Sequence, residues 1–486
     1  MTCRATFFLV LVLSTGSNVQ ASRPAGDGSS LPREAATALR KAAVYFRESV
    51  STEGGYLWRY SEDLSRREGE GLADDKTVWL QPPGTPAVGM AFLQAYWDTG
   101  ESCYLDAAVA AGDCLVRGQL RSGGWDNHIT FDPSRRRNYA YRVDEPGSGR
   151  PRNTTTLDDD KTQSAVRLLM HLDATLEFKN ERIHECVLYA LQALLNAQYP
   201  NGAWPQRFSE PPDPNACPVL QASFPSSWPW EFPNTKYAGY YTFNDNVIGD
   251  VAETMSLARR VYGDERYLQA IERAGDFILR AQMPDPQPAW AQQYDLQMHP
   301  AWARKFEPPA ITGGESQGII RTLLQIYGET GKRRCLDAVP RAIAYLRRSE
   351  LPDGRLARFY ELRTSRPLYC TKDYVLTYSD RDVPTHYSFK AANRLDSLER
   401  AYRQMLALPA SELGPKPYKR PLPSARPSGS QVRRVIDSLD ARGRWVEQDR
   451  LRYQKEQGTT ERIISCQTFI TNCRILSSYL AAQRAR

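Results

Sequence analysis

The chain has 486 residues, a net charge of +7, 26 tyrosines and ten tryptophans. This length is sufficient for a large hydrophobic core or for more than one domain. The positive charge is not concentrated in a dense lysine and arginine run, and no nucleic-acid-binding motif is present, so we expect no nucleic acid partner.

Residues 1–21 have the pattern of a secretory signal peptide. Arg4 precedes the apolar run of residues 7–13, and Val19-Gln20-Ala21 supplies a cleavage site. The apolar run is too short to span a bilayer, and no later stretch is long enough; a membrane anchor is the alternative interpretation. We therefore predict a secreted protein, extracellular or periplasmic, that is a monomer with no membrane contact after signal removal. Its basic, aromatic composition suits an acidic carbohydrate, although a merely basic surface is the bland alternative.

Eight cysteines follow the signal peptide. They are Cys103, Cys114, Cys186, Cys217, Cys335, Cys370, Cys466 and Cys473. An even number of cysteines in an exported protein predicts disulfides, and the neighbouring Cys466 and Cys473 are one option for a pair. No Cys-x-x-Cys pattern indicates a zinc site.

Beyond a Ser/Gly-rich segment at 22–31, which we expect to be flexible, apolar residues recur at helical spacing. A first helix starts at Pro32, and Val247, Val251 and Met255 illustrate the apolar stripe of a later one. The predicted helix pairs cover about 86–97 with 104–120, 159–174 with 181–198, 246–262 with 265–282, and 315–327 with 335–348.

These pairs form an internal repeat with a period of roughly 65–85 residues. Each pair ends in a Gly/Pro loop that usually carries an aromatic residue, as in Gly202-Ala203-Trp204. Five such units, counting the N-terminal one, predict an all-α protein with a partly or fully closed α/α toroid and its loops on one rim. The toroid would cover residues 32–407, including a helix at about 390–406. A Pro-rich linker or wrap, 408–430, and C-terminal helices that dock on the toroid, 431–486, would follow.

The five histidines do not suggest a catalytic triad or a zinc site, and no Gly-x-Ser-x-Gly elbow is present. Two acidic clusters are the stronger candidates. Asp158 and Asp159 lie in one cluster and Asp245 in the other, each at a helix start in successive repeats. Their oxygens are the hard ligands that Ca²⁺ prefers. Helix N-capping is the alternative, but one cap needs one carboxylate, and adjacent carboxylates repel unless a cation is near.

Arginine-rich loops follow the third and fourth repeats, at 302–309 and 355–367, and contain Arg304, Arg358 and Arg366. Arginine binds carboxylates through two hydrogen bonds, so these loops suit a uronate polymer; surface ion pairs are the alternative. Trp204 and the other loop tryptophans can stack on sugar rings or simply close their loops by packing.

With these segments in view, the chain resembles the family 10 pectate lyases. The segments that match, in order and spacing, are 156–162, 198–206, 241–246, 288–309, 313–317 and 358–367. The family has an α/α toroid fold and cleaves polygalacturonate by Ca²⁺-assisted β-elimination. The resemblance therefore implies a secreted pectate lyase that acts on α-1,4-polygalacturonate with Ca²⁺ as cofactor.

The resemblance also implies roles for individual residues. Asp158 and Asp245 would hold the calcium, with Asp159 beside them, and Arg358 would remove the C5 proton of the sugar. The residues that we expect to bind substrate are Lys161, Trp204, Tyr241, Asn244, Arg304 and Arg366. Arginine is normally always protonated, so nearby Ca²⁺ and other arginines would have to favour its neutral form. Alternatively, Arg358 only clamps the carboxylate.

The chain departs from the family pattern at several positions. Lys161 replaces a small residue, Asp159 replaces Asn, Ala203 replaces Gly, Tyr241 replaces His, and the insert 209–234 is long. These departures leave open a non-catalytic protein that binds acidic polysaccharide, or another uronate lyase or a glycosidase on the same toroid. A terpene cyclase is disfavoured because the Asp-x-Asp-Asp pattern is absent.

Overall fold

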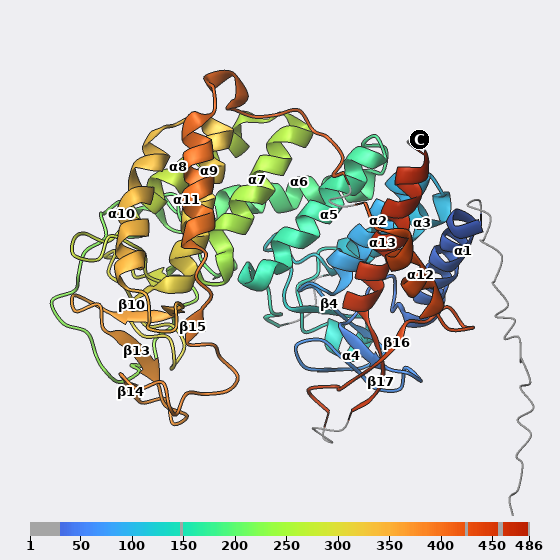
Figure 1. Ribbon diagram of the computed structural model, residues 1–486, viewed down its shortest axis with the longest axis horizontal. Coiled ribbons are helices and arrows are strands. Elements are labelled where there is room, and N and C mark those ends of the chain that lie inside the picture. The colour runs from blue at the N-terminus through green and yellow to red at the C-terminus, as the bar shows by residue number, and fades with distance from the viewer. Residues whose placement is uncertain (1–29, 146–148, 423–425, 455–459, 485–486) are drawn as a thin grey trace, which may run out of the picture.

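The computed structural model describes residues 30–145, 149–422, 426–454 and 460–484. The predicted signal peptide at 1–21 and residues 22–29 of the segment predicted to be flexible lie outside the described residues. Within these ranges the fold is largely helical, with short strands gathered below the helices in the view of Figure 1.

Four helical hairpins form most of the molecule, and they confirm the predicted pairs to within a few residues. They are α2 (Thr85–Thr99) with α3 (Ser102–Gly118), α5 (Lys161–Thr175) with α6 (Glu181–Asn196), α7 (Val247–Tyr262) with α8 (Glu265–Ala281), and α9 (Gly313–Thr330) with α10 (Arg334–Arg348). Gly100, Gly263 and Gly331 end three of the first helices in the left-handed conformation that glycine adopts without strain. The chain therefore reverses sharply within each hairpin.

The first helices of the hairpins pack against one another in sequence order, and the second helices cover them on the outside. The inner arc continues from α9 to α11 (Leu395–Ala407) at one end and from α2 to α13 (Cys466–Arg484) at the other (Figure 1). At that second end, α1 (Ser30–Tyr45), which continues as a π-helix to Val50, packs on α13. The architecture is therefore the predicted α/α toroid, but its first unit is built from both ends of the chain.

Short strands replace two predicted helix starts. The helix predicted at 390–406 begins only at Leu395, because Lys390–Ala391 form β15, which pairs with β11 (Leu356–Ala357). Within the C-terminal segment predicted to be helical, 431–486, the last helix is preceded by β17 (Glu461–Ser465), which pairs with β16 (Val446–Asp449) and β1 (Arg59–Ser61). Strands of two to five residues are too short to show a period of two in the sequence.

Two larger sheets are present in the described residues, and the first of them contains β16, β17 and β1. β1 continues into β2 (Arg67–Glu68) and β3 (Leu72–Ala73), giving the order β16-β17-β1-β2-β3. The second sheet has the order β10-β12-β13-β14, with bounds Ala310–Thr312, Phe359–Glu361, Pro367–Cys370 and Leu376–Thr377.

A common strand pairing joins the loops of successive repeats on one rim. A strand before each inner helix pairs with a strand in the loop after the outer helix. The pairs are β4 (Thr77–Trp79) with β5 (His128–Thr130), β6 (Thr155–Thr156) with β7 (Arg207–Phe208), β8 (Tyr241–Thr242) with β9 (Gln293–Tyr294), and β10 with β12. The loops that carry the candidate site residues are thereby fixed to the helix starts.

The Pro-rich segment predicted as a linker or wrap contacts several inner helices. The amide of Gly414 donates to the carbonyl of Gly328 on α9, and the hydroxyl of Tyr418 lies 2.9 Å from Nδ1 of His171 on α5. Beyond it, α12 (Gly429–Asp437) and α13 pack together. Phe469 of α13 stacks on Phe46 of the N-terminal π-helix, so the C-terminal segment completes the helical layer.

All eight cysteines after the predicted signal peptide are free thiols in the structure. Cys466 and Cys473 lie seven residues apart on α13, a rise of about 10 Å, which is beyond the reach of a disulfide. The suggested pair is therefore wrong. None of the described helices is long and apolar enough to cross a membrane.

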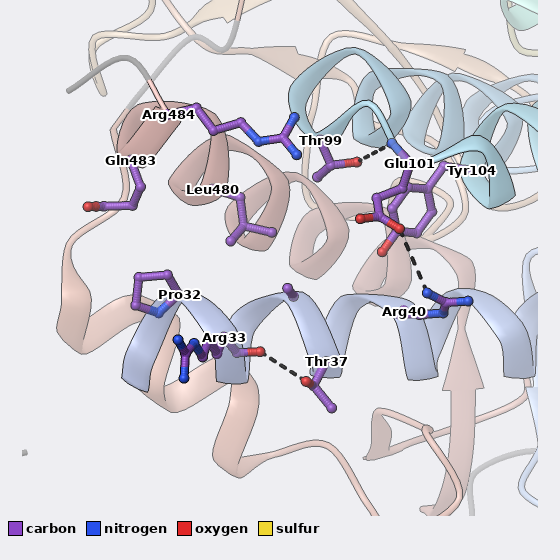
Figure 2. Close-up of a pocket in the computed structure, with 11 residues that line it drawn as sticks. Pro32, Arg33, Thr37, Arg40, Thr99, Glu101, Tyr104, Leu480, Gln483 and Arg484 are labelled. Carbon is purple, nitrogen blue, oxygen red and sulfur yellow. Dashed lines mark hydrogen bonds and ion pairs between the residues drawn. The ribbon is translucent and has the colours of Figure 1, made fainter. Parts of the chain in front are cut away.

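A pocket of about 470 Å³ lies between α1, the end of α13 and the start of α3 (Figure 2). An ion pair between Arg40 and Glu101, 3.7 Å apart, crosses one end of it. None of the predicted site residues lines this pocket, so the candidate chemistry must be sought on the rim.

The buried His171 gives the fold a predictable pH dependence. Burial, with the charges of Arg167 and Arg260, lowers the pKa of His171 from 6.5 to about 4. The unfolded chain therefore binds a proton that the folded chain does not, and the stabilisation falls as pH drops from 6.5 towards 4. Over this interval the wild type should lose about 3 kcal/mol more unfolding free energy than His171→Gln, measured by urea denaturation. Parallel losses in the two proteins would contradict this assignment.

Candidate active site

The two acidic clusters occupy the same backbone turn in successive repeats. Asp159 and Asp160 have φ values of 48° and 59° before α5, and Asp245 and Asn246 have values of 50° and 58° before α7. Asp and Asn tolerate this left-handed conformation better than other residues with a side chain. Neither Asp160 nor Asn246 makes a side-chain capping bond to its helix, so the capping interpretation does not hold here.

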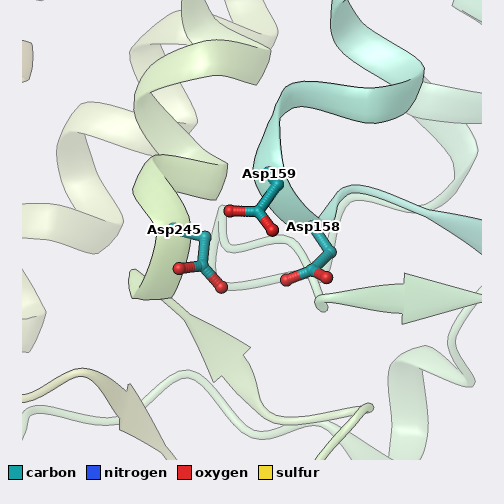
Figure 3. Close-up of side chains that lie close together, drawn as sticks. All are labelled: Asp158, Asp159 and Asp245. Carbon is teal, nitrogen blue, oxygen red and sulfur yellow. The ribbon is translucent and has the colours of Figure 1, made fainter. Parts of the chain in front are cut away.

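The paired turns bring three carboxylates together (Figure 3). Oxygens of Asp158, Asp159 and Asp245 lie within 4.8 Å of one another. Burial, a hydrogen bond with Asp158 and the charges of the neighbouring aspartates raise the pKa of Asp245 to about 9. Burial and the charge of Asp158 also raise the pKa of Asp159. A cation would relieve this repulsion, and the three carboxylates could hold one.

Lys161 points into this cluster, although we expected it to bind substrate. Its side chain is fully buried, and Nζ lies 3.1 Å from Oδ2 of Asp158, 3.5 Å from Oδ2 of Asp159 and 3.8 Å from Oε2 of Glu70. Burial favours a raised pKa for Asp158, but the charge of Lys161, the hydrogen bonds with Asp245 and Lys161 and the charge of Arg207 together outweigh it, and the pKa is lowered. One cation that the carboxylates require is thus supplied by the chain itself.

Arg304 is anchored by a buried carboxylate. Its Nε and its backbone amide donate to Oε2 of Glu307 at 2.8 and 3.1 Å, and Glu307 is fully buried. Glu307 also accepts hydrogen bonds from Nε2 of Gln292 at 2.8 Å and from the hydroxyl of Tyr387 at 2.9 Å. The buried Glu307 therefore fixes the conformation of the loop 302–309.

Glu307 is also linked to Asp245, through the side-chain amides of Gln292 and Asn244. Nε2 of Gln292 donates to Oδ1 of Asn244, and Nδ2 of Asn244 donates to Oδ2 of Asp245. Asn244 is only 3% exposed. Its oxygen and its nitrogen each have a partner in the described structure, so the amide orients Asp245, and its role in binding substrate stays a prediction.

Arg358 lies on the same side of the rim. Its Nη2 donates to Oε1 of Glu315 at 2.8 Å, and its guanidinium lies 4.3 Å from the ring centre of Tyr387. Burial lowers the pKa of Arg358, but Glu315 and Tyr387 outweigh it, and the net pKa is raised. These surroundings favour the charged form, contrary to the expectation from the sequence. The charge of Asp245 acts on both Arg358 and Arg304, so aspartates and arginines share one site.

Two of the predicted substrate-binding aromatics are core residues. Trp204 and Tyr241 are both 0% exposed. The indole of Trp204 donates to the carbonyl of Leu194 at 2.8 Å, and Trp125 and Trp290 make the same bond in their own repeats. These residues close the rim loops by packing and cannot stack on a sugar, because no face of either ring reaches solvent.

Arg366 lies elsewhere on the loops. Its guanidinium covers the ring of Tyr378 at 3.4 Å, and within the described residues it makes no hydrogen bond or ion pair with the acidic cluster. Of the predicted site residues, the structure thus brings together Asp158, Asp159, Asp245, Lys161, Asn244, Arg304 and Arg358.

Several residues of the site were not predicted. Nε2 of Gln206 donates to Oδ1 of Asp158 at 2.7 Å, and the charge of Arg207 acts on the same carboxylate. Both belong to the repeated loop after α6, so the repeat itself was a usable signal. Glu70 and Tyr387 lie in irregular segments far away in sequence, where no pattern marks them.

Comparison with known proteins identifies the family of the chain. The sequence model of the pectic acid lyases matches residues 119–386, more than half of the chain. The chain belongs to the pectic acid lyase family. It is accordingly a polysaccharide lyase, and the matched region contains all three aspartates and both central arginines. A comparison with curated proteins finds no match.

Similar solved structures include the family 10 polysaccharide lyase from Cellvibrio cellulosa, with 21% identity over 61% of this chain and 92% of that chain and a TM-score of 0.45. A mutant of that enzyme in complex with trigalacturonic acid has 20% identity over 66% and 98%, with a TM-score of 0.46. Cellobiose 2-epimerase from Bacillus thermoamylovorans has 13% identity over 93% and 99%, with a TM-score of 0.44.

The core assignment of Trp204 is testable by a conservative substitution. Trp204→Phe removes the hydrogen bond to Leu194 and part of a buried ring, so we expect the free energy of unfolding to fall by about 1–3 kcal/mol. The KM of the folded variant for its polysaccharide should remain unchanged. A large rise in KM without loss of stability would instead restore the sugar-stacking role.

Proposed function

We propose that this pectic acid lyase is a secreted monomer that cleaves α-1,4-polygalacturonate by β-elimination at the rim site. The observation that carries the proposal is the convergence of Asp158, Asp159 and Asp245 within 4.8 Å, with Arg304 and Arg358 both under the influence of Asp245. Carboxylates that hold a cation and guanidiniums that hold carboxylates together suit a polymer of uronates.

The three aspartates fit a calcium ion. Their oxygens are of the hard type, and the ammonium of Lys161 leaves two of their three negative charges without a partner inside the cluster. Bound there, Ca²⁺ would neutralise a substrate carboxylate and so stabilise the negative charge that develops when the C5 proton leaves. Asp158, Asp159 and Asp245 would be its protein ligands.

The arginines would orient the sugar and move the proton. Arg304, held rigidly by Glu307, would bind a uronate carboxylate. Arg358 would take the C5 proton as the C5–H electrons form the C4–C5 double bond. The C4–O bond would break with its electron pair on the leaving glycosidic oxygen, which then takes a proton from water. To act as a base, Arg358 must first lose a proton, and Oε1 of Glu315 is an acceptor 2.8 Å away. High pH would favour this step.

Activity provides the first test. Polygalacturonate should yield products with the ultraviolet absorbance of a 4,5-unsaturated uronate, and EGTA should abolish the rise. Asp245→Ala should lower kcat by about 10²-fold or more, because it removes charge that stabilises the transition state. Asp106→Ala, which changes an exposed aspartate on outer helix α3, is the control and should leave kcat unchanged.

Other outcomes would identify other functions. New reducing ends without the unsaturated chromophore would indicate a glycosidase. Retained polymer binding with no turnover at any Ca²⁺ concentration would indicate a binding protein. Either result would overturn the lyase proposal.

Lys161 gives a test that does not depend on turnover. Its ammonium lies next to two of the proposed ligands, so it should weaken Ca²⁺ binding. Lys161→Met should tighten the Ca²⁺ dissociation constant by at least about tenfold, measured by isothermal titration calorimetry, and should increase the rise in Tm on adding Ca²⁺. Lys161→Arg, which keeps the charge, is the matched control. Equal or weaker Ca²⁺ binding by Lys161→Met would contradict this role.

A further inference from the structure

The insert 209–234, which departs from the family pattern, carries a stacked pair of tryptophans, of which Trp228 is partly buried and Trp230 is exposed. The ring centres of Trp228 and Trp230 lie 5.3 Å apart with planes inclined by 19°, and Trp230 is 43% exposed. Large apolar surfaces seldom face solvent in this way unless they contact a partner. The pair therefore needs an explanation beyond packing.

Tyr378 and Arg366 extend this aromatic surface. Tyr378 is 38% exposed, and its ring meets that of Trp230 edge-on at 5.7 Å. Its hydroxyl donates to Oε1 of Glu361 at 2.9 Å, which fixes the ring. The guanidinium of Arg366 lies 3.4 Å from the centre of the same ring, a cation–π contact that holds the arginine in place.

Arg366 has a charge to offer. No carboxylate within the described part of the chain forms an ion pair with its guanidinium, whereas neighbouring Arg363 donates to the carbonyl of Pro225 in the insert. A flat aromatic surface beside an unpaired guanidinium presents an apolar face and a carboxylate-binding group together. A uronate ring offers the complementary pair, an apolar face and a carboxylate.

Two structural links connect the proposed active site with the patch, a surface formed by Trp228, Trp230, Tyr378 and Arg366. The indole of Trp302, two residues before Arg304, donates at 3.0 Å to the carbonyl of Pro229, which lies between Trp228 and Trp230 in the sequence. Arg358 directly precedes β12, and Glu361, which holds Tyr378, is the last residue of that strand. Three residues of extended strand span about 10 Å, so the backbone positions of Arg358 and Glu361 are close enough for one polymer chain to reach both.

We propose that Trp228, Trp230, Tyr378 and Arg366 form a second binding site for acidic polysaccharide, which holds the part of the chain that extends beyond the reacting sugars. The proposal rests on the proposed function and adds a place where polymer length is recognised. Arg366, predicted from the sequence to bind substrate, would do so here rather than at the acidic cluster. The positive charge favours a polyuronate over a neutral glycan as occupant.

Kinetics on long and short substrates would test the site. Trp230→Ala and Arg366→Ala should each raise the KM for polygalacturonate by about three- to tenfold, with unchanged kcat and unchanged KM for trigalacturonate. Trp230→Tyr should restore most of the affinity. Phe178→Ala, which removes an equally exposed aromatic between α5 and α6, should have no effect.

A binding measurement separates this inference from the lyase proposal. In polygalacturonate affinity gels, Asp245→Ala should be retarded. The double variant that carries both Asp245→Ala and Trp230→Ala should be retarded less. If the wild type cleaves the polymer but Trp230→Ala has the wild-type KM and retardation, this inference alone fails. If the wild type neither cleaves nor binds, both fail. Self-association in analytical ultracentrifugation that is lost in Trp230→Ala would assign the patch to a second copy of the chain and overturn the inference.

Discussion

Repulsion among three largely buried carboxylates is the constraint on which the site depends. Asp158 and Asp159 come from one repeat and Asp245 from the next, and identical left-handed turns direct them to one point. Carboxylates this close cannot all remain ionised without a cation. Lys161 neutralises one negative charge and a proton on Asp245 removes a second, which leaves one, so a divalent ion would displace that proton. The charge of the site is thus coupled to its occupancy by metal.

A second constraint keeps the arginines and aspartates in register. Glu307 holds Arg304 directly and reaches Asp245 through Gln292 and Asn244. Glu307 is fully buried, and each of these groups is hydrogen-bonded to the next. Moving one of them would therefore leave another buried polar group without a partner. The site is therefore organised before substrate arrives, which is what electrostatic stabilisation of a transition state requires.

The sequence predicted the hairpins because their apolar stripes repeat at helical spacing, and it located Asp158 and Asp245 because both recur at helix starts. It could not show that α1 pairs with α13, since nothing local marks a contact between the chain ends. It also misplaced Trp204, because a loop aromatic beside glycine looks the same whether the ring faces the core or the solvent. The sequence did not predict Glu70 as a site residue, because it lies in an irregular segment that has no recognisable pattern.

The two turns share one backbone conformation but differ in the charges of their side chains. Asp158, Asp160 and Lys161 in the first turn correspond to Asn244, Asn246 and Val247 in the second, while Asp159 corresponds to Asp245. The backbone is the same, so the fold provides the turn, and the side chains alone decide the charge. The first turn carries nearly all the acid and also its own counter-ion. The second adds one carboxylate to the excess that Lys161 alone does not neutralise. That excess makes the interface between these two repeats, among all the rim loops described, the place where a cation and an acidic polymer would meet.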